Sequence, residues 1–132
     1  MLYQVFVYGT LLVGESNHHV ASPYLISVRS GHVKGYLYDV GAYPALVLDD
    51  EGNEIPGEWF TVTEEGLKQM DWLEDYEEGR ADNEYERVLV KDCRQDMEGY
   101  VYVYSLEKAK HLPIIPSQSW RKHRGKEHHL KD

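Results

Sequence analysis

The chain has 132 residues, of which 42% are hydrophobic and 28% charged, so it suits one globular domain and is too apolar for a disordered chain. Fourteen basic residues against 23 acidic ones give a net charge of -9, which repels phosphate backbones and anionic membrane surfaces. Composition therefore argues against both a nucleic-acid partner and a membrane partner.

The first part of the chain predicts strands separated by loops. Side chains over residues 3–8 alternate in the way of a strand that is buried on at least one face. This strand ends at Gly9-Thr10, where we expect glycine to free the backbone for a turn. Residues 12–31 have no clear period and predict a loop with a short helical turn. Further strands are predicted over 33–40 and 43–48.

The middle of the chain contains the one strong helix signal. After a turn cluster comes a predicted strand over 55–62, and Thr63 can cap a helix that runs to about Glu77. Two more alternating segments, 85–91 and 99–105, predict strands joined by a short connection. Together these elements predict an α+β fold: a small mixed or mostly antiparallel β-barrel with one principal helix and short peripheral helices.

The C-terminal segment differs in composition from the rest. Residues 113–132 hold five Lys or Arg, three His and two acidic residues, so we divide the chain into a domain over 1–112 and a basic, His-rich extension. The extension is interpreted as a solvated tail or a peripheral helix. A metal site built from His123, His128 and His129 is the alternative, although adjacent histidines in a tail are a weak signal.

The apolar stretches, the first residues and the number of cysteines predict the cellular location. No stretch approaches the roughly 20 apolar residues that span a bilayer, and residues 1–5 do not resemble a secretory leader. The single cysteine, Cys93, has no partner for an internal disulfide. These features favour a reducing cytoplasm, and Asp92 beside Cys93 argues against an activated thiol.

Glu74 is the most interesting carboxylate of the predicted helix. It follows Leu67 and Met70 at helical spacing, so a helix places it on the apolar face. A carboxyl group that is desolvated there has a raised pKa, which suits proton transfer near neutral pH. The alternative is a structural carboxylate that is paired with Arg80, Arg87 or a backbone amide.

A second feature is the Tyr8-Gly9-Thr10-Leu11 segment at the end of the first strand. A glycine turn can aim successive main-chain N–H groups into one concavity, which then binds an anion such as a carboxylate. A simple turn explains the same four residues. No phosphate loop or dinucleotide fingerprint follows, so the sequence predicts no nucleotide cofactor.

Five short motifs, taken in order over residues 3–105, resemble the gamma-glutamyl cyclotransferase-like superfamily. Met70-Asp71 stands in place of a Leu-Asp pair, and a residue triplet at 119–121 is similar to a segment near the end of some bacterial members. The motifs are Tyr8-Gly9-Thr10-Leu11, Gly35-Tyr36-Leu37-Tyr38-Asp39, Gly41-Ala42-Tyr43-Pro44-Ala45-Leu46-Val47, Met70-Asp71-Trp72-Leu73-Glu74 and Tyr85-Glu86-Arg87.

This resemblance implies a specific activity. Members fold as a small β-barrel with helices around it and need no cofactor. They cyclise the γ-glutamyl group of a small molecule and release 5-oxoproline and a free amine or amino acid. It implies that Glu74 is the acid–base residue and that a substrate-binding set surrounds it. That set is Tyr8, Gly9, Thr10, Leu11, Tyr85 and Tyr102.

One departure from the family pattern concerns the loop after Glu74. Asp75 stands where several eukaryotic members have glycine, and residues 75–84 form a long and charged segment. Because this loop is expected to border the pocket, we expect the accepted leaving group to differ from dipeptides derived from glutathione. A non-catalytic domain that binds a small carboxylate and a Glu-dependent amide hydrolase are the alternative functions. The sequence predicts no oligomeric state.

Overall fold

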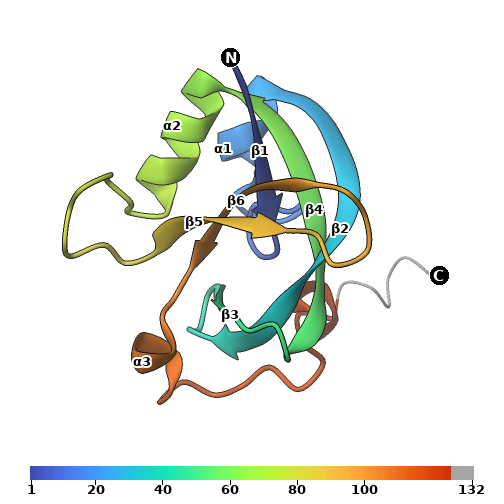
Figure 1. The fold of residues 1–132 in the computed structure, drawn as a ribbon, viewed down its shortest axis with the longest axis vertical. Coiled ribbons are helices and arrows are strands. Elements are labelled where there is room, and N and C mark those ends of the chain that lie inside the picture. The colour runs from blue at the N-terminus through green and yellow to red at the C-terminus, as the bar shows by residue number, and fades with distance from the viewer. Residues whose placement is uncertain (126–132) are drawn as a thin grey trace.

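A computed structural model describes residues 1–125, which form one six-stranded sheet with short helices around it (Figure 1). The strand order is β3-β2-β4-β1-β6-β5, and every neighbouring pair is antiparallel except β1 and β6, which run parallel. The strands are β1 Leu2–Val7, β2 Leu25–Asp39, β3 Pro44–Leu48, β4 Asn53–Thr63, β5 Glu86–Lys91 and β6 Glu98–Val103. The helices are α1 His18–Ala21, the 3-10 turn η1 Ser22–Tyr24, α2 Glu64–Leu73, α3 Leu106–Ala109 and α4 Trp120–His123.

The mixed sheet curls into a half-barrel, which confirms the predicted α+β class. The N–H group of Tyr104, just after β6, donates to the Leu46 carbonyl of β3 at 2.9 Å, so the edge strand β3 approaches the chain that leaves β6. Five of the predicted strands are confirmed to within two residues at each end. They are 3–8, 43–48, 55–62, 85–91 and 99–105.

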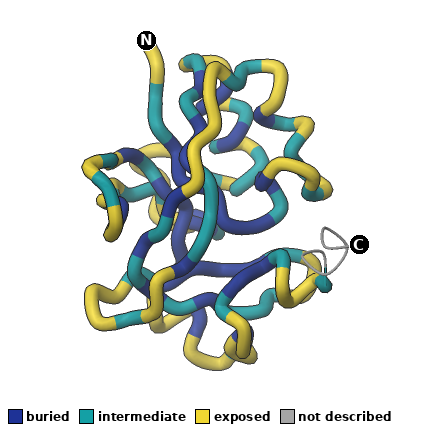
Figure 2. Tube along the Cα trace, turned by 90° about the vertical axis from the view of Figure 1, so that its right-hand side faces the viewer, coloured by how far each residue is buried: buried dark blue, intermediate teal, exposed yellow. Residues whose placement is uncertain are grey.

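The central strand β1 serves two core clusters because successive side chains of a strand point to opposite faces. Val5 and Val7 pack into one cluster, while Phe6 and Tyr8 pack into the other. Figure 2 shows these buried segments running through the middle of the molecule, with exposed segments concentrated in the loops. Strand β1 is therefore held rigidly, and so is the loop that leaves its end.

The prediction of a loop over residues 12–31 is wrong for its second half. Strand β2 begins at Leu25 and pairs with β4 from Leu25↔Val62 to Gly35↔Asn53, with an irregularity between Leu25 and Ser27. The side chains over 26–30 are all exposed, so this part of the strand has no alternation of buried and exposed positions. The predicted helical turn is α1 together with η1.

Helix α2 begins as predicted but ends earlier. Thr63 caps it, because its hydroxyl oxygen accepts a hydrogen bond from the Gly66 N–H at 3.2 Å. The predicted end near Glu77 is wrong, since the helix ends at Leu73. Asp75 has a left-handed backbone with a φ of 53°, which cannot continue a right-handed helix. Glu74 is thus the C-terminal cap rather than an interior helical residue.

The segment after residue 112 packs against the sheet as far as it is described. Ile115 and Trp120 are buried in the core cluster that contains Phe6. The Ile115 N–H donates to the Leu37 carbonyl of β2 at 3.0 Å. The division of the chain at residue 112 stays a prediction about its organisation. Of the histidines considered as metal ligands, His128 and His129 lie outside the described residues.

Two remaining expectations concern His123 and the membrane. His123 Nε2 lies 2.9 Å from Asp39 Oδ2, so this ring is engaged with β2. Within residues 1–125, no helix has the length and apolar character needed to cross a bilayer.

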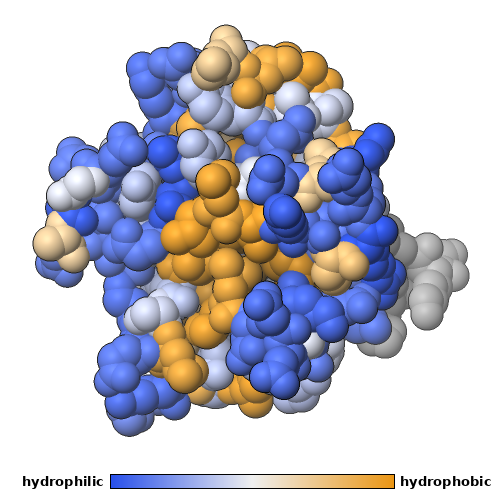
Figure 3. Space-filling view, viewed as in Figure 1, coloured by the Kyte–Doolittle hydropathy of each residue, from blue (hydrophilic) through white to orange (hydrophobic). Residues whose placement is uncertain are grey.

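Figure 3 shows a hydrophobic area at the centre of one face over β5, whose Leu89 is 65% exposed. Hydrophilic residues surround this area.

Candidate active site

A cavity of about 190 Å³ lies where the loop after β1 meets the C-terminal end of α2. All seven residues that the sequence singled out line it, so the structure brings together segments that are far apart in the chain. The lining residues are Phe6, Val7, Tyr8, Gly9, Thr10, Leu11, Asn17, Tyr43, Pro44, Leu73, Glu74, Glu84, Tyr85 and Tyr102.

Glu74 presents an isolated carboxyl group to this cavity. Burial raises its pKa to about 8, and the nearby charge of Glu84 adds to the effect. No other described residue makes a hydrogen bond or an ion pair with its side chain. Arg80 pairs instead with Asp75 at 3.0 Å. The structural alternative, in which an arginine or an amide neutralises Glu74, is therefore wrong for the described part of the chain.

The loop after β1 forms a tight turn whose two central N–H groups have no acceptor in the described part of the chain. Leu12 N–H donates to the Gly9 carbonyl at 3.1 Å, which closes a turn around Thr10 and Leu11. The N–H groups of those two central residues form no hydrogen bond with any residue between 1 and 125. Because both belong to residues that line the cavity, they are suited to bind an anion there.

Gly9 is required for space rather than for an unusual backbone angle. It does not have a positive φ, which corrects the expected reason for a glycine at this turn. A Cβ at this position would lie 2.6 Å from Pro44 Cγ and 2.7 Å from Pro44 Cδ. Glycine thus allows the turn to approach the start of β3, and this close approach forms one side of the cavity.

Asn17 holds the turn from inside the loop and was missed in the sequence. Its Nδ2 donates to Thr10 Oγ1 at 3.0 Å, and its main-chain N–H donates to the Thr10 carbonyl at 2.8 Å. Asn17 lies in the stretch without periodicity, so no pattern distinguished it from its neighbours. Both contacts fix the orientation of Thr10.

The turn is also held from outside, by the C-terminal helix. Val13 N–H donates to Glu58 Oε1 at 2.9 Å, and Arg121 Nη2 donates to the Val13 carbonyl at 2.6 Å. Arg121 is also 3.4 Å from Glu58 Oε2. We call these three residues the Val13 clamp. It connects β4 and α4 to the segment that follows the turn.

The three tyrosines expected to bind substrate line the cavity, but each hydroxyl already donates to the protein. Tyr8 donates to the Tyr102 carbonyl at 2.6 Å, and Tyr85 donates to the Pro44 carbonyl at 2.7 Å. Tyr102 donates to Asp71 Oδ1 at 2.6 Å. Burial raises the pKa of all three hydroxyls, so they remain protonated. Their rings shape the cavity.

Asp71 connects the last turn of α2 to the sheet three residues before Glu74. Its Oδ1 accepts from Tyr102 of β6, and its Oδ2 accepts from Arg87 Nη1 of β5 at 2.6 Å. The Arg87 guanidinium also lies over the Tyr100 ring, 4.5 Å from its centroid. Arg87 therefore anchors the helix and does not face the cavity. Asp71 fixes the helix end from which Glu74 projects.

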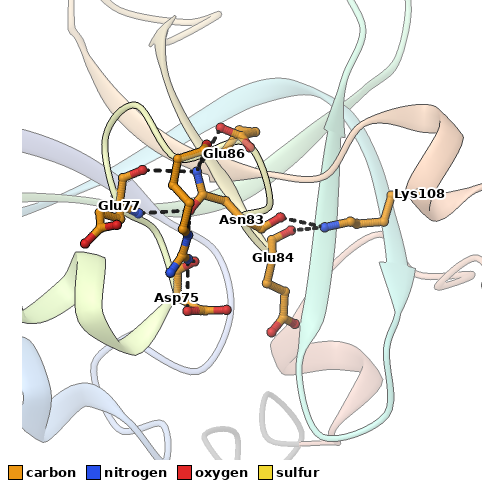
Figure 4. A network of polar contacts seen from close by, with 7 residues as sticks. Asp75, Glu77, Asn83, Glu84, Glu86 and Lys108 are labelled. Carbon is orange, nitrogen blue, oxygen red and sulfur yellow. Dashed lines mark hydrogen bonds and ion pairs between the residues drawn. The ribbon is translucent and has the colours of Figure 1, made fainter.

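Glu84 is a cavity-lining acid that sequence reasoning overlooked. Its Oε2 accepts hydrogen bonds from the hydroxyls of Tyr43 at 2.6 Å and Tyr104 at 2.9 Å. The bond to Glu84 raises the pKa of Tyr43 to about 12. Lys108 Nζ reaches the main-chain oxygens of Asn83 and Glu84, at 2.9 and 2.6 Å. Figure 4 shows the Glu84 carboxylate pointing away from this lysine.

Within residues 1–125, neither a group of metal ligands nor a thiol lines the cavity. In the part of the chain that is described, no three His, Cys, Asp or Glu side chains gather as metal ligands do. Cys93 lies outside the cavity, and burial raises the pKa of its thiol, with Glu54 and Asp92 adding to the effect. Acid–base chemistry at Glu74 is the reaction type that the cavity supports.

The sequence matches a known protein family over most of its length. The family model described as "Gamma-glutamyl cyclotransferase, AIG2-like" matches residues 5–122. A relative from Halalkalibacterium halodurans, provisionally named a gamma-glutamylcyclotransferase, is 39% identical over 93 residues, 70% of this chain and 83% of the relative. The gamma-L-glutamyl-butirosin B gamma-glutamyl cyclotransferase of Niallia circulans is 37% identical over 105 residues, 76% of this chain and 66% of that protein.

The fold is also similar to a solved structure. A crystal structure of an AIG2-like protein from Mus musculus has a TM-score of 0.70 and 25% sequence identity. The similarity covers 86% of this chain and 85% of the mouse chain.

Proposed function

Because the chain belongs to the gamma-glutamyl cyclotransferase, AIG2-like family, we propose that it cyclises a small γ-glutamyl substrate and releases 5-oxoproline and a free amine. The observation that carries this proposal is the isolated carboxyl group of Glu74, with a pKa of about 8, in the cavity lined by the Thr10–Leu11 turn. The turn supplies donors for a carboxylate, and Glu74 supplies the group that moves a proton.

Binding begins at the turn. The N–H groups of Thr10 and Leu11 donate to the α-carboxylate of the γ-glutamyl unit, which they can do because no described acceptor uses them. The tyrosine rings of the cavity restrict the chain of the bound unit. Since the amine and the γ-carbonyl belong to one molecule, holding that molecule in a folded conformation brings the reacting atoms together.

A single residue, Glu74, carries the proton while bonds form and break. The α-amine, after losing its extra proton to solvent, attacks the γ-carbonyl carbon, and a new C–N bond closes the five-membered ring. Glu74 as a carboxylate takes one proton from the attacking nitrogen. Glu74 then returns this proton to the nitrogen of the leaving amine as the original C–N bond breaks. The products are 5-oxoproline and the free amine, and Glu74 is regenerated.

The raised pKa of Glu74 suits both halves of this cycle. A carboxyl group with an ordinary pKa holds its proton too weakly to give it to an amine near neutral pH. A pKa of about 8 brings the proton affinity of Glu74 closer to that of the two nitrogens. This reaction needs no metal and no cofactor.

The proposal is tested with a panel of γ-glutamyl amides and γ-glutamyl amino acids, with 5-oxoproline and glutamate measured by mass spectrometry. We expect 5-oxoproline from the wild type and a decrease in rate of about 100-fold or more in Glu74→Gln. Glu78→Gln, an exposed acid in the following loop, is the matched control and should retain the wild-type rate.

Three results would count against the proposal. Undiminished turnover in Glu74→Gln would reject Glu74 as the proton carrier. Free glutamate in place of 5-oxoproline would indicate an amide hydrolase. Binding of γ-glutamyl compounds without any product would indicate a carboxylate-binding domain.

A further inference from the structure

The charged side chains that line the cavity are both acidic. Among the described lining residues, Glu74 and Glu84 carry carboxyl groups, and no Lys, Arg or His is present. Any substrate therefore meets carboxyl groups without a compensating cation from the described lining residues. The main-chain N–H groups of the turn are the donors available to one carboxylate, that of the γ-glutamyl unit.

Glu84 is a lining acid that forms no ion pair with any residue between 1 and 125. Its Oε2 accepts hydrogen bonds from two tyrosine hydroxyls, while its Oε1 has no partner among those residues. The nearby cation, Lys108, is occupied by two main-chain oxygens and lies 5.0 Å from the Tyr104 ring centroid. Figure 4 shows that the carboxylate and the lysine diverge.

Given the function proposed above, we propose that Glu84 selects the leaving group by charge. It favours γ-glutamyl amides whose leaving amine carries a second positive group, such as a diamine. It disfavours leaving groups that carry a carboxylate, such as amino acids. The cause is Coulomb interaction in a cavity where burial weakens solvent screening, and where no Lys, Arg or His among residues 1–125 lines the wall to bind a second carboxylate.

Hydrogen bonds from the hydroxyls of Tyr43 and Tyr104 hold the Glu84 carboxyl group in place. Tyr43 lies just before β3 and Tyr104 just after β6, so Glu84 is bound to the ends of two separate strands. Their rings also flank Tyr85, with centroids 6.2 Å and 4.7 Å from its own. A carboxylate next to aromatic rings is a suitable environment for an ammonium group, because the faces of the rings also attract cations.

The test uses three substrates of nearly equal size that differ in charge. They are the γ-glutamyl amides of butylamine, 1,4-diaminobutane and 4-aminobutyrate. In the wild type we expect kcat/KM to be at least about tenfold higher for the diamine than for the aminobutyrate, with butylamine between them. Added salt should reduce this ratio.

Glu84→Gln keeps the size of the side chain and an acceptor for a tyrosine while removing the charge. We expect it to bring the three kcat/KM values within about threefold of one another, whereas Glu78→Gln should leave the order unchanged. If Glu84→Gln does not fold, the salt dependence of the wild type still tests the proposal. An equal decrease in kcat/KM for all three substrates would overturn the proposal. That result would mean that Glu84 contacts the α-ammonium group of the γ-glutamyl unit, which all three substrates share.

The neutral butylamide separates this inference from the proposed function. Turnover of the butylamide with no preference between the charged substrates would overturn charge selection and leave the cyclotransferase proposal standing. If none of the three is turned over, the proposed function fails. In that case the same order is expected in their Kd values, and equal Kd values would overturn charge selection as well.

Discussion

The two sides of the cavity work in different ways. The turn side, residues 8–17, presents main-chain N–H groups and is held from outside by Glu58 and Arg121. The acid side, Glu74 and Glu84, presents side chains that have no compensating cation among residues 1–125. Main-chain donors need a particular backbone shape, so the turn depends on space and anchoring. Acid–base chemistry needs a side chain with a shifted pKa, so the acid side depends on keeping water away from Glu74.

The largest effect is expected on the acid side, from the change Asp71→Asn. The amide loses the charge that balances Arg87, whose side chain is only 12% exposed, and breaking such a pair costs about 3 kcal/mol of folding free energy. The variant also loosens the helix end that carries Glu74, so kcat should decrease about tenfold or more while KM changes little. Denaturant unfolding and steady-state kinetics measure both effects.

The matched control for Asp71→Asn is Asp75→Asn, which weakens an exposed pair with Arg80 in the same region. It should change the free energy of unfolding by less than about 1 kcal/mol. Equal loss of stability in the two variants would show that Asp71 is not the residue that anchors the helix end.

The next effect is expected on the turn side, from Gly9→Ala. A methyl group there meets the Pro44 ring at 2.6 Å, and the overpacking should cost about 2 kcal/mol of folding free energy. Because relief of this contact moves the turn, KM should rise more than kcat falls. Thermal unfolding and kinetics on any accepted γ-glutamyl substrate give the measurement.

Gly79→Ala is the comparison for this substitution. Gly79 has a φ of +81° and open space around its Cα, so alanine costs only backbone strain of about 1 kcal/mol. A KM that is unchanged in Gly9→Ala, or changed as much in Gly79→Ala, would contradict the role of the close approach between the turn and Pro44.

A smaller effect is expected from Arg121→Ala in the Val13 clamp. Loss of the 2.6 Å bond to the Val13 carbonyl frees the turn from outside, so KM should rise about threefold to tenfold while kcat is nearly preserved. Arg121→Lys should recover part of the affinity, because a lysine can also donate to this carbonyl. Arg124→Ala, on the same C-terminal segment, should leave KM unchanged, and an equal effect of the two alanine variants would refute the clamp.

The parts of this site that could be predicted are those that lie on a regular element or in a short motif. Glu74 stood out by its spacing from Met70, and Tyr8–Leu11 by its position after a strand. The helix end could not be placed, because Asp75 adopts a left-handed φ that its residue type does not require.

Other parts depend on contacts that no local pattern encodes. Glu84 is one acid in a loop rich in acids, and it is distinguished only by Tyr43 and Tyr104, which are 41 and 20 residues away. The bond from Arg121 to Val13 spans 108 residues. Residues 25–31 are predicted as a loop because the alternation of Ile26 and Val28 with polar residues is too short to stand out, and neither side chain is buried. This part of β2 is recognised only by its hydrogen-bonded pairing with β4.

The central claim is that the cavity desolvates Glu74 and thereby raises its pKa into the range in which this group can both take up and return a proton. Carbon-13 NMR of protein labelled at glutamate side-chain carboxyls tests this claim directly, with the signal of Glu74 assigned as the one missing from Glu74→Gln. We predict a titration midpoint of about 8 in the wild type. A midpoint near the ordinary value of 4.5 would contradict the account.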